Sequence, residues 1–459
     1  MNMLNQKLVW DQAMIEKYNY SGPRYTSYPT ALEFDESFSY QDFRFACDET
    51  PDKPLSLYVH IPFCHKLCYY CGCNKVITRH LHKADKYLDV LEAEIKLQAP
   101  FFKNRHVSQL HWGGGTPTFL TQPQIQRLID VLKNSFNFDD DAEISIEVDP
   151  REIELSTIDL LSKVGFNRLS LGVQDFDKKV QVAVNREQDE DFIFAIIKRA
   201  HELGFKSTNI DLIYGLPHQT KATFHKTLER VLDLDPARLT VFNYAHIPSL
   251  FAGQRKMKEE DMPSASDRLA ILEDAISFLT DNGYQFIGMD HFAKPDDELA
   301  IAQREGILHR NFQGYTTQGE SDLLGLGVSS ISQIGNAYSQ NQKELKAYYQ
   351  QVEELGHAQW RGVGLNDDDS IRRAVIKQLM CNFELDMDKI AATFQLDFAT
   401  YFAEDMTLLQ TFINDELVVI EGNMLQVAPK GKLLIRNICM CFDVYLRQRA
   451  RQQQFSRVI

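Results

Sequence analysis

The sequence contains no long apolar run, and this absence limits where the protein can work. No uninterrupted apolar segment approaches the roughly 20 residues of a membrane-spanning helix. The opening segment Met1–Leu8 also has no apolar stretch long enough for the core of a secretory signal. We therefore expect a soluble cytoplasmic protein that does not insert into a membrane.

An excess of positive charge is also missing. Lysine and arginine number 49 against 64 aspartates and glutamates, which gives a formal net charge of −15 at pH 7. A chain this acidic repels the phosphate backbone, so we expect no nucleic-acid partner, although a local basic patch can still bind an anion. The contents of hydrophobic residues (44%) and charged residues (25%) are ordinary for a globular protein, and 459 residues suggest two or three domains.

Cysteine is scarce but clustered. Of the eight cysteines, four lie within ten residues, at Cys64, Cys68, Cys71 and Cys73. A disulfide framework would spread its cysteines and would suit a small secreted chain. Clustering in a large cytoplasmic chain indicates metal or redox chemistry instead.

Short β-branched or aromatic runs alternate with longer amphipathic stretches in the middle of the chain. The predicted strands are 55–60, 107–112, 142–148, 168–174, 208–214 and 238–244. The predicted helices are 82–99, 122–135, 155–164, 188–203, 221–234 and 265–281. This alternation predicts an α/β fold of six βα units with parallel strands. Six units suit a partial (β/α)6 barrel, which we favour, or an open sheet, and a full eightfold barrel would need two more.

The segments outside this alternation complete the expected domain organisation. Residues 1–45 are rich in tyrosine and turn residues and predict an N-terminal arm before the core at 46–281. Residues 282–364 are expected to extend the sheet and connect the domains, with a possible edge strand at 284–289. Residues 365–459 predict a mainly helical C-terminal domain with a small hairpin around Gly422.

The cysteine loop follows the first predicted strand, so it is expected at the C-terminal face of the sheet, where sites gather. Thiolates at these spacings can hold an iron–sulfur cluster. Zinc is an alternative, but Cys71 and Cys73 are separated by one residue, which is tight for two ligands of one ion. Buried cysteines without metal are a second alternative. We favour the cluster.

The pattern Cys64-x3-Cys68-x2-Cys71 resembles the signature of the radical S-adenosylmethionine superfamily. The resemblance implies that three thiolates hold three irons of a 4Fe–4S cluster. The fourth iron would bind the amino and carboxylate groups of S-adenosylmethionine. Reduction would then cleave the sulfonium to a 5′-deoxyadenosyl radical.

Four segments narrow this likeness to one family. They are the Cys-Gly-Cys ending at 71–73 and the segments 22–30, 111–118 and 311–315. Together they resemble oxygen-independent coproporphyrinogen III oxidase along essentially the full chain, as far as the last residues at 454–459. In that family the fourth cysteine is not a cluster ligand, so the implied metal set is Cys64, Cys68 and Cys71, without Cys73.

The resemblance also implies cofactor contacts. It places Gly114 at one cofactor molecule and a second molecule at Gly115, Thr116, Gln174, Arg186 and Asp211. The remaining implied contacts are Tyr58, Tyr70, Glu147, Ala245 and Ile331. The residues alone also allow plainer interpretations: a tight glycine turn, solvated strand-end acids and core tyrosines. No catalytic residue is expected beyond the cluster and the cofactor.

The implied substrate is a tetrapyrrole with four propionates, which needs local cations on an acidic protein. Arginine suits carboxylates, and the candidates are Arg24 and Arg310. The basic tail 430–459 is interpreted instead as a solvated helix face. His60, His65 and His111 flank the expected site and are either proton carriers or structural histidines.

By this likeness we expect oxidative decarboxylation of two propionates of coproporphyrinogen III to vinyl groups in haem biosynthesis. The enzyme is expected to be a monomer with an electron donor and acceptor of unknown identity. The alternatives are a haem-binding chaperone, another radical enzyme that modifies tetrapyrroles, and a zinc-stabilised structural protein. Haem-binding relatives typically lack the Cys-Gly-Cys ending and the tyrosine-rich arm, and both are present here.

Overall fold

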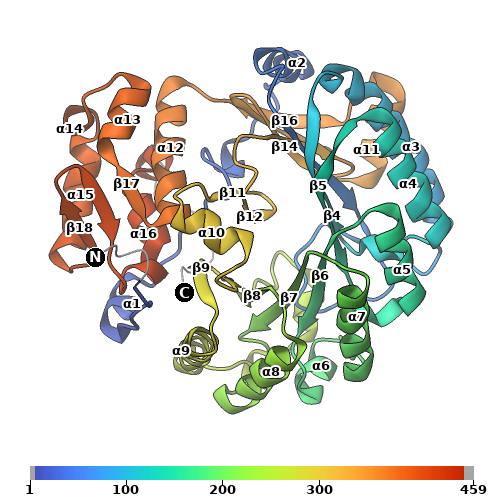
Figure 1. The fold of residues 1–459 in the computed structure, drawn as a ribbon, viewed down its shortest axis with the longest axis horizontal. Coiled ribbons are helices and arrows are strands. Elements are labelled where there is room, and N and C mark those ends of the chain that lie inside the picture. The colour runs from blue at the N-terminus through green and yellow to red at the C-terminus, as the bar shows by residue number, and fades with distance from the viewer. Residues whose placement is uncertain (1–5, 449–459) are drawn as a thin grey trace. The chain divides into compact units, whose positions relative to one another are not determined.

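The computed structural model describes residues 6–448 (Figure 1). Its contacts define two compact units that interleave along the chain. The larger unit comprises 34–275 and 320–364, and the smaller unit comprises the chain up to Glu33, 276–319 and the chain from Leu365. These units are defined by contacts and differ from the predicted domain segments, whose limits remain predictions.

The six predicted strands form the central sheet of the larger unit. They are β1 (Leu55–Ile61), β4 (His106–Gly114), β5 (Asn137–Val148), β6 (Arg168–Gln174), β7 (Ser207–Tyr214) and β8 (Arg238–Asn243). Each is parallel to the next in chain order. Since parallel strands need crossovers, helices follow most of them, which confirms the predicted α/β class with a parallel sheet.

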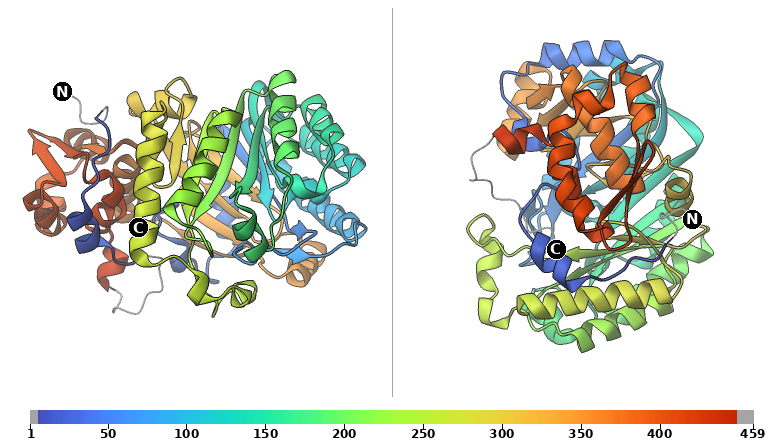
Figure 2. Two further views of the ribbon diagram at one scale, coloured as in Figure 1. Left: turned by 90° about the horizontal axis from the view of Figure 1, so that it is seen from below. Right: turned by 90° about the vertical axis from the view of Figure 1, so that its left-hand side faces the viewer.

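The helices of these crossovers pack beside one another in chain order. They are α3 (Lys83–Gln98), α4 (Gln122–Ser135), α5 (Leu155–Val164), α7 (Glu190–Glu202) and α8 (Lys221–Leu234), with a short α6 (Lys178–Ala183) before α7. α9 (Ala265–Asp281) follows β8 along the chain. The crossover helices form one layer against the sheet, which Figures 1 and 2 show from three directions.

The two faces of the sheet differ in polarity, and this difference positions the site. In β1, Leu55, Leu57, Val59 and Ile61 are completely buried, while the alternating residues include Tyr58 and His60. Side chains alternate between faces along a strand. The same alternation places His111, Glu147 and Asp211 on the polar face.

The sheet of the larger unit continues beyond β1. The added strands are β13 (Asp322–Leu326), β14 (Ile331–Ile334), β15 (Ala337–Asn341) and β16 (Gln359–Gly364). β13 is parallel to β1, whereas β14, β15 and β16 pair antiparallel. Two helices complete this part, α2 (Tyr40–Glu49) and α11 (Leu345–Leu355).

The smaller unit combines the N-terminal segment with the C-terminal helices. Its helices are α1 (Gln12–Tyr18), α10 (Glu298–Arg304), α12 (Asp367–Asn382), α13 (Met387–Phe394), α14 (Phe398–Tyr401), α15 (Ala403–Asn414), α16 (Ile435–Met440) and α17 (Val444–Gln448). Its strands are β9 (Gln285–Gly288), β10 (His291–Ala293), β11 (His309–Asn311), β12 (Gly314–Thr316), β17 (Glu384–Asp386), β18 (Val418–Glu421) and β19 (Met424–Val427). β18 and β19 form the predicted hairpin, in which Gly422 adopts a φ of +60°.

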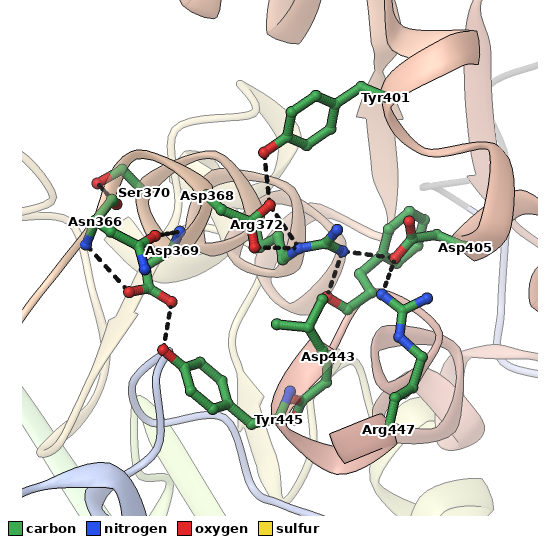
Figure 3. A network of polar contacts seen from close by, with 12 residues as sticks. Asn366, Asp368, Asp369, Ser370, Arg372, Tyr401, Asp405, Asp443, Tyr445 and Arg447 are labelled. Atoms are coloured by element: carbon green, nitrogen blue, oxygen red, sulfur yellow. Dashed lines mark hydrogen bonds and ion pairs between the residues drawn. The ribbon is translucent and has the colours of Figure 1, made fainter.

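Arginines of the smaller unit connect its helices, as Figure 3 shows. Arg372 of α12 donates to Asp405 of α15 at 2.6 Å and to the Phe442 carbonyl at 3.1 Å. Arg447 donates to the same Asp405 at 2.9 Å. Because the buried Asp405 carboxylate has two cationic partners, its charge costs little when the helices pack.

The interpretation of the basic tail as a solvated helix face is wrong for Arg436. This residue of α16 is only 2% exposed, and its guanidinium donates to the carbonyls of Gly22 and Pro23. The carbonyls of the N-terminal segment thus replace water as acceptors. The last residues of the tail, including Arg449, Arg451 and Arg457, lie outside the described residues.

Candidate cluster and cofactor site

The cysteine loop is closed at its base by a short parallel pair of strands. β2 (Phe63–Cys64) pairs with β3 (Val76–Ile77), and the Thr78 amide donates to the Cys64 carbonyl at 3.0 Å. This pairing brings both ends of the loop together at the C-terminal end of β1. Cys64 and Cys68 are buried, Cys71 is half-buried and Cys73 is exposed.

Polar donors surround the sulfur atoms. Thr116 donates to Cys64 Sγ at 3.4 Å, and Arg151 and Arg186 donate to Cys68 Sγ at 3.2 and 3.4 Å. A hydrogen bond from Cys73 lowers the pKa of the Cys71 thiol below its ordinary value, despite its burial. Cationic and hydrogen-bonding donors favour a thiolate, which is the form that binds metal.

The glycine turn after β4 lies directly against the start of the cysteine loop. The Gly115 amide donates to the Ile61 carbonyl at 2.8 Å. A Cβ at Gly115 would lie 2.8 Å from the Pro62 carbonyl atoms, and one at Gly114, whose φ is +114°, would lie 2.6 Å from His60. Only glycine permits this approach of two backbones. The turn is therefore tied to the loop that carries the cysteines.

We expect Gly115→Ala to displace the turn, because the atoms that its Cβ would meet belong to the backbone and cannot rotate away. Overpacking of this kind costs about 1–3 kcal/mol; where this cost falls on the cofactor-bound state, the affinity for S-adenosylmethionine falls by about 5- to 150-fold. Equilibrium dialysis measures the affinity, and iron analysis measures the cluster. The control is Gly364→Ala, whose Cβ would meet only Phe38 at 3.9 Å. Unchanged affinity for S-adenosylmethionine in Gly115→Ala would contradict the assignment of this glycine turn to the cofactor site.

A cavity of about 160 Å³ opens beside the loop on the polar face of the sheet. Eleven of the predicted site residues line it: Cys64, Cys68, Cys71, Tyr70, Gly114, Gly115, Thr116, Glu147, Gln174, Arg186 and Asp211. The structure thus brings together residues that come from the ends of four strands and from the loop.

Three predicted contacts lie outside the lining of this cavity. The Tyr58 hydroxyl is 3.1 Å from His60 Nδ1, and the Tyr58 ring stacks on His111. The Ala245 carbonyl accepts from Gln254, whose amide also donates to the Tyr70 carbonyl in the cysteine loop. Ile331 begins β14. Their roles remain predictions.

Two carboxylates form one wall of the cavity. Glu147 accepts from the Gly114 amide at 3.3 Å, and its side chain is 45% exposed. Asp211 accepts from Asn209 at 2.8 Å and from Ser170 at 3.0 Å. Burial, followed by the charge of Glu147, raises the pKa of Asp211 to about 6. Asp211 therefore changes charge close to neutral pH.

An ion triad at the end of β5 was not predicted from the sequence. Asp149 accepts from Arg151 at 2.6 Å and from Arg186 at 3.2 Å. Burial alone would raise the pKa of Asp149, but the two guanidinium groups hold it well below its usual range. Arg151 also donates to the Asn185 carbonyl, and the Asn185 amide donates to the Leu67 carbonyl. The triad therefore connects three segments around Cys68.

The cavity retains buried polar atoms that have no partner. Gln174 Oε1 and Arg186 Nε are both buried and have no hydrogen-bond partner among residues 6–448. Gln174 also adopts a φ of +69°, a strained conformation typical of functional sites. Buried polar groups are normally satisfied, so these atoms fit a polar ligand in the cavity.

The thiol set fits a cluster better than a single zinc ion. Within residues 6–448, no three His, Cys, Asp or Glu side chains lie close enough to bind one metal ion. A zinc site needs its ligands around one point, whereas the thiolates of an iron–sulfur cluster bind different irons. Cys64, Cys68 and Cys71 all line the cavity, where an iron–sulfur cluster could be bound by one thiolate per iron.

The predicted substrate arginines lie in the smaller unit. Arg310 donates to the Arg24 carbonyl, and Arg24 forms an ion pair with Asp290. The Arg310 guanidinium lies 5.4 Å from the centre of the Tyr315 ring, and its Nε has no partner. The two candidates are thus neighbours.

The flanking histidines have structural contacts. His60 Nε2 is 3.0 Å from the Asn74 carbonyl, and His111 Nδ1 is 2.7 Å from Ser145. The His65 ring packs on Phe119 with a centroid distance of 4.4 Å. These contacts favour the structural interpretation.

The fold and the site define a radical S-adenosylmethionine protein. Residues 58–231 match the Radical SAM superfamily, and residues 365–434 match the HemN C-terminal domain. No helix among residues 6–448 is long and apolar enough to cross a membrane.

The chain is 66% identical to the oxygen-independent coproporphyrinogen III oxidase of Escherichia coli (strain K12), with 99% of both chains covered. It is 48% identical to the Synechocystis enzyme of that name over 97% of both chains. A solved structure of the Escherichia coli coproporphyrinogen III oxidase, described as a radical SAM enzyme, matches 96% of this chain and 100% of its own, with 64% identity and a TM-score of 0.93. The chain therefore belongs to the oxygen-independent coproporphyrinogen III oxidase family, which confirms the resemblance.

Proposed function

We propose that the chain converts coproporphyrinogen III to protoporphyrinogen IX without oxygen, by oxidative decarboxylation of two propionates to vinyl groups. The observation that carries the proposal is the full-length similarity to enzymes of this name, with an intact three-thiol loop at the wall of a polar cavity. The reaction removes two hydrogen atoms, two electrons and two molecules of carbon dioxide in total, and the electrons pass to an acceptor of unknown identity.

Cys64, Cys68 and Cys71 would hold a 4Fe–4S cluster, and the cavity would hold S-adenosylmethionine. Bound there, this pair supplies a 5′-deoxyadenosyl radical, which can take a hydrogen atom from a propionate β-carbon. The chain's own residues position the reactants. Glu147 offers a carboxylate for ribose hydroxyls, and the backbone at Gly114 allows a ligand to approach closely.

We further propose that Arg24 and Arg310 bind propionate carboxylates. Arg24 is 36% exposed and Arg310 Nε has no partner, so both retain donors for an anion. Guanidinium groups match carboxylates geometrically.

We also propose a cytoplasmic monomer, whose expected mass in light scattering is 52.9 kDa.

We propose that the cavity takes a second S-adenosylmethionine, which Gly115, Thr116, Gln174, Arg186 and Asp211 would contact. The cofactor carries a positive sulfonium and ammonium, so its binding is expected to strengthen as Asp211 ionises. The pKa of Asp211 is raised to about 6, so its charge is absent well below pH 6 and present above it. Two molecules should bind per chain at pH 7.5, and the weaker site should lose affinity at pH 5.5.

Equilibrium dialysis of the oxidised holoenzyme at the two pH values measures this stoichiometry. Asp211→Asn should bind one molecule at both pH values. The control is Asp140→Asn, an exposed acid on β5 that does not line the cavity. A single site at both pH values in the wild-type protein would show that the second site does not exist.

A strictly anaerobic assay tests the proposed function. The reconstituted enzyme is given coproporphyrinogen III, S-adenosylmethionine, a reductant and an electron acceptor, and the porphyrins are separated after oxidation. Protoporphyrin should appear together with 5′-deoxyadenosine, and neither should appear without S-adenosylmethionine. An intact cluster with no turnover of the tetrapyrrole would favour a haem-binding chaperone instead.

A further inference from the structure

A basic hollow lies beside the cysteine loop in the larger unit and adjoins the cofactor cavity, since Lys66 lines both. Its lining includes the cationic side chains Lys66, Arg79 and Lys83 and the histidines His65 and His80. No carboxylate is among the described residues that line it. In a chain with a net charge of −15, such a concentration of positive charge is unusual.

Two cations of the hollow are available for a partner. Arg79 and Lys83 are exposed, and neither forms an ion pair with another described residue. Lys66 differs, since it pairs with Glu152 at 2.8 Å. Exposed cations without intramolecular partners contribute most of their charge to the surrounding field.

The same surface also exposes large apolar side chains. Ile77, which lines the hollow, is 42% exposed, and Leu81 is 40% exposed between Arg79 and Lys83 in the sequence. Apolar contacts within a charged rim are the usual composition of a protein–protein interface. A small anion such as phosphate makes no apolar contacts, so these two side chains favour a protein partner.

The hollow has a direct connection to a proposed cluster ligand. Ile77 is the register partner of Cys64 in the β2–β3 pair, and the Thr78 amide donates to the Cys64 carbonyl at 3.0 Å. A protein bound at Ile77 and Arg79 would therefore be separated from the Cys64 backbone by one strand. Short separations favour electron transfer, and interfaces between redox partners are small and transient.

We propose that this basic hollow is the docking surface of an acidic one-electron donor protein that reduces the cluster. The inference rests on the proposed function, because it needs a cluster on the cysteine loop. Complementary charge steers a partner to the correct face and accelerates association, chiefly at low ionic strength. The chain's overall negative charge would repel an acidic donor elsewhere, so the hollow would also select the orientation.

The test measures the rate of cluster reduction in the reconstituted holoenzyme by stopped-flow absorbance. The donor is a purified acidic flavodoxin in its reduced form, and dithionite serves as the small reductant. The double variant Arg79→Glu/Lys83→Glu should lower the second-order rate with flavodoxin by about tenfold or more, since steering changes rates by about 10–10³-fold. The wild-type rate should also fall as ionic strength rises. The rate with dithionite should not change.

Lys198→Glu/Lys206→Glu is the matched control, because both are exposed lysines that do not line the hollow, and this double variant changes the net charge by the same amount. An equal loss of rate in this variant would overturn the proposal, since net charge alone would then explain the effect. An unchanged flavodoxin rate in the double variant would overturn it as well. Failure of the proposed function is distinguishable, because it would appear either as a missing cluster in every protein, including the wild type, or as a reducible cluster with no turnover of coproporphyrinogen III in the anaerobic assay.

Discussion

Replacing any one of Cys64, Cys68 or Cys71 with alanine is expected to abolish the cluster. The turnover rate should fall by about 10³-fold or more, as it does when other indispensable catalytic groups are removed. All three thiols line the cavity. A cluster that keeps one iron open for the cofactor needs each of them as a ligand. Cys73→Ala is expected to assemble a normal cluster. In the structure Cys73 is the exposed thiol that supplies a hydrogen bond to Cys71.

Iron and sulfide analysis with electron paramagnetic resonance of the reduced proteins measures both outcomes. A serine variant at each position controls for packing, because serine keeps the size of the side chain but is a poor ligand for iron. A cluster that survives Cys68→Ala but is lost in Cys73→Ala would mean that the ligand set is wrong.

Asp149→Asn is expected to destabilise the larger unit by about 3–5 kcal/mol, the usual cost of removing one partner from a buried ion pair. The side chain of Asp149 is 12% exposed, and its loss would leave the guanidinium groups of Arg151 and Arg186 facing each other beside Cys68. Because the folded-state pKa of Asp149 is depressed, its contribution is present above about pH 4, the usual pKa of the side chain, and is lost as the pH falls further.

Denaturant unfolding at pH 7, followed together with cluster content, measures this effect. The control is Asp159→Asn, since Asp159 pairs with Arg199 at a site where its side chain is 44% exposed. An exposed pair is worth less than about 1 kcal/mol, so this variant should unfold almost as the wild type does. Equal losses of the free energy of unfolding in the two variants would show that the buried triad stabilises the larger unit no more than an exposed ion pair does.

The alternation of short strands and amphipathic helices was sufficient to predict the parallel sheet and the position of the cysteine loop at its C-terminal face. Alternation along β1 and β5 separates buried side chains from Tyr58 and Glu147, and parallel strands bring their C-terminal ends to one edge. The positions of Glu147 and Asp211 at the cavity follow from this rule. The family resemblance, and not the periodicity, assigned them to a cofactor.

Long-range contacts could not be predicted in the same way. Arg151 meets Cys68 across 83 residues of chain, and nothing local to Arg151 indicates that contact. Arg436 was misjudged because its acceptors are carbonyls of the N-terminal segment, more than 400 residues away. The parallel position of β13 beside β1 is likewise fixed by pairing between distant segments. The one signal available for Arg151 was its place directly after a strand end.

The most direct test of the proposed hydrogen abstraction uses coproporphyrinogen III with deuterium on the propionate β-carbons. After anaerobic turnover with unlabelled S-adenosylmethionine, mass spectrometry measures deuterium in the recovered 5′-deoxyadenosine. If the 5′-deoxyadenosyl radical takes its hydrogen from the propionate β-carbon, 5′-deoxyadenosine should gain deuterium in step with the formation of vinyl groups. Protoporphyrin formed with no deuterium in 5′-deoxyadenosine would contradict it.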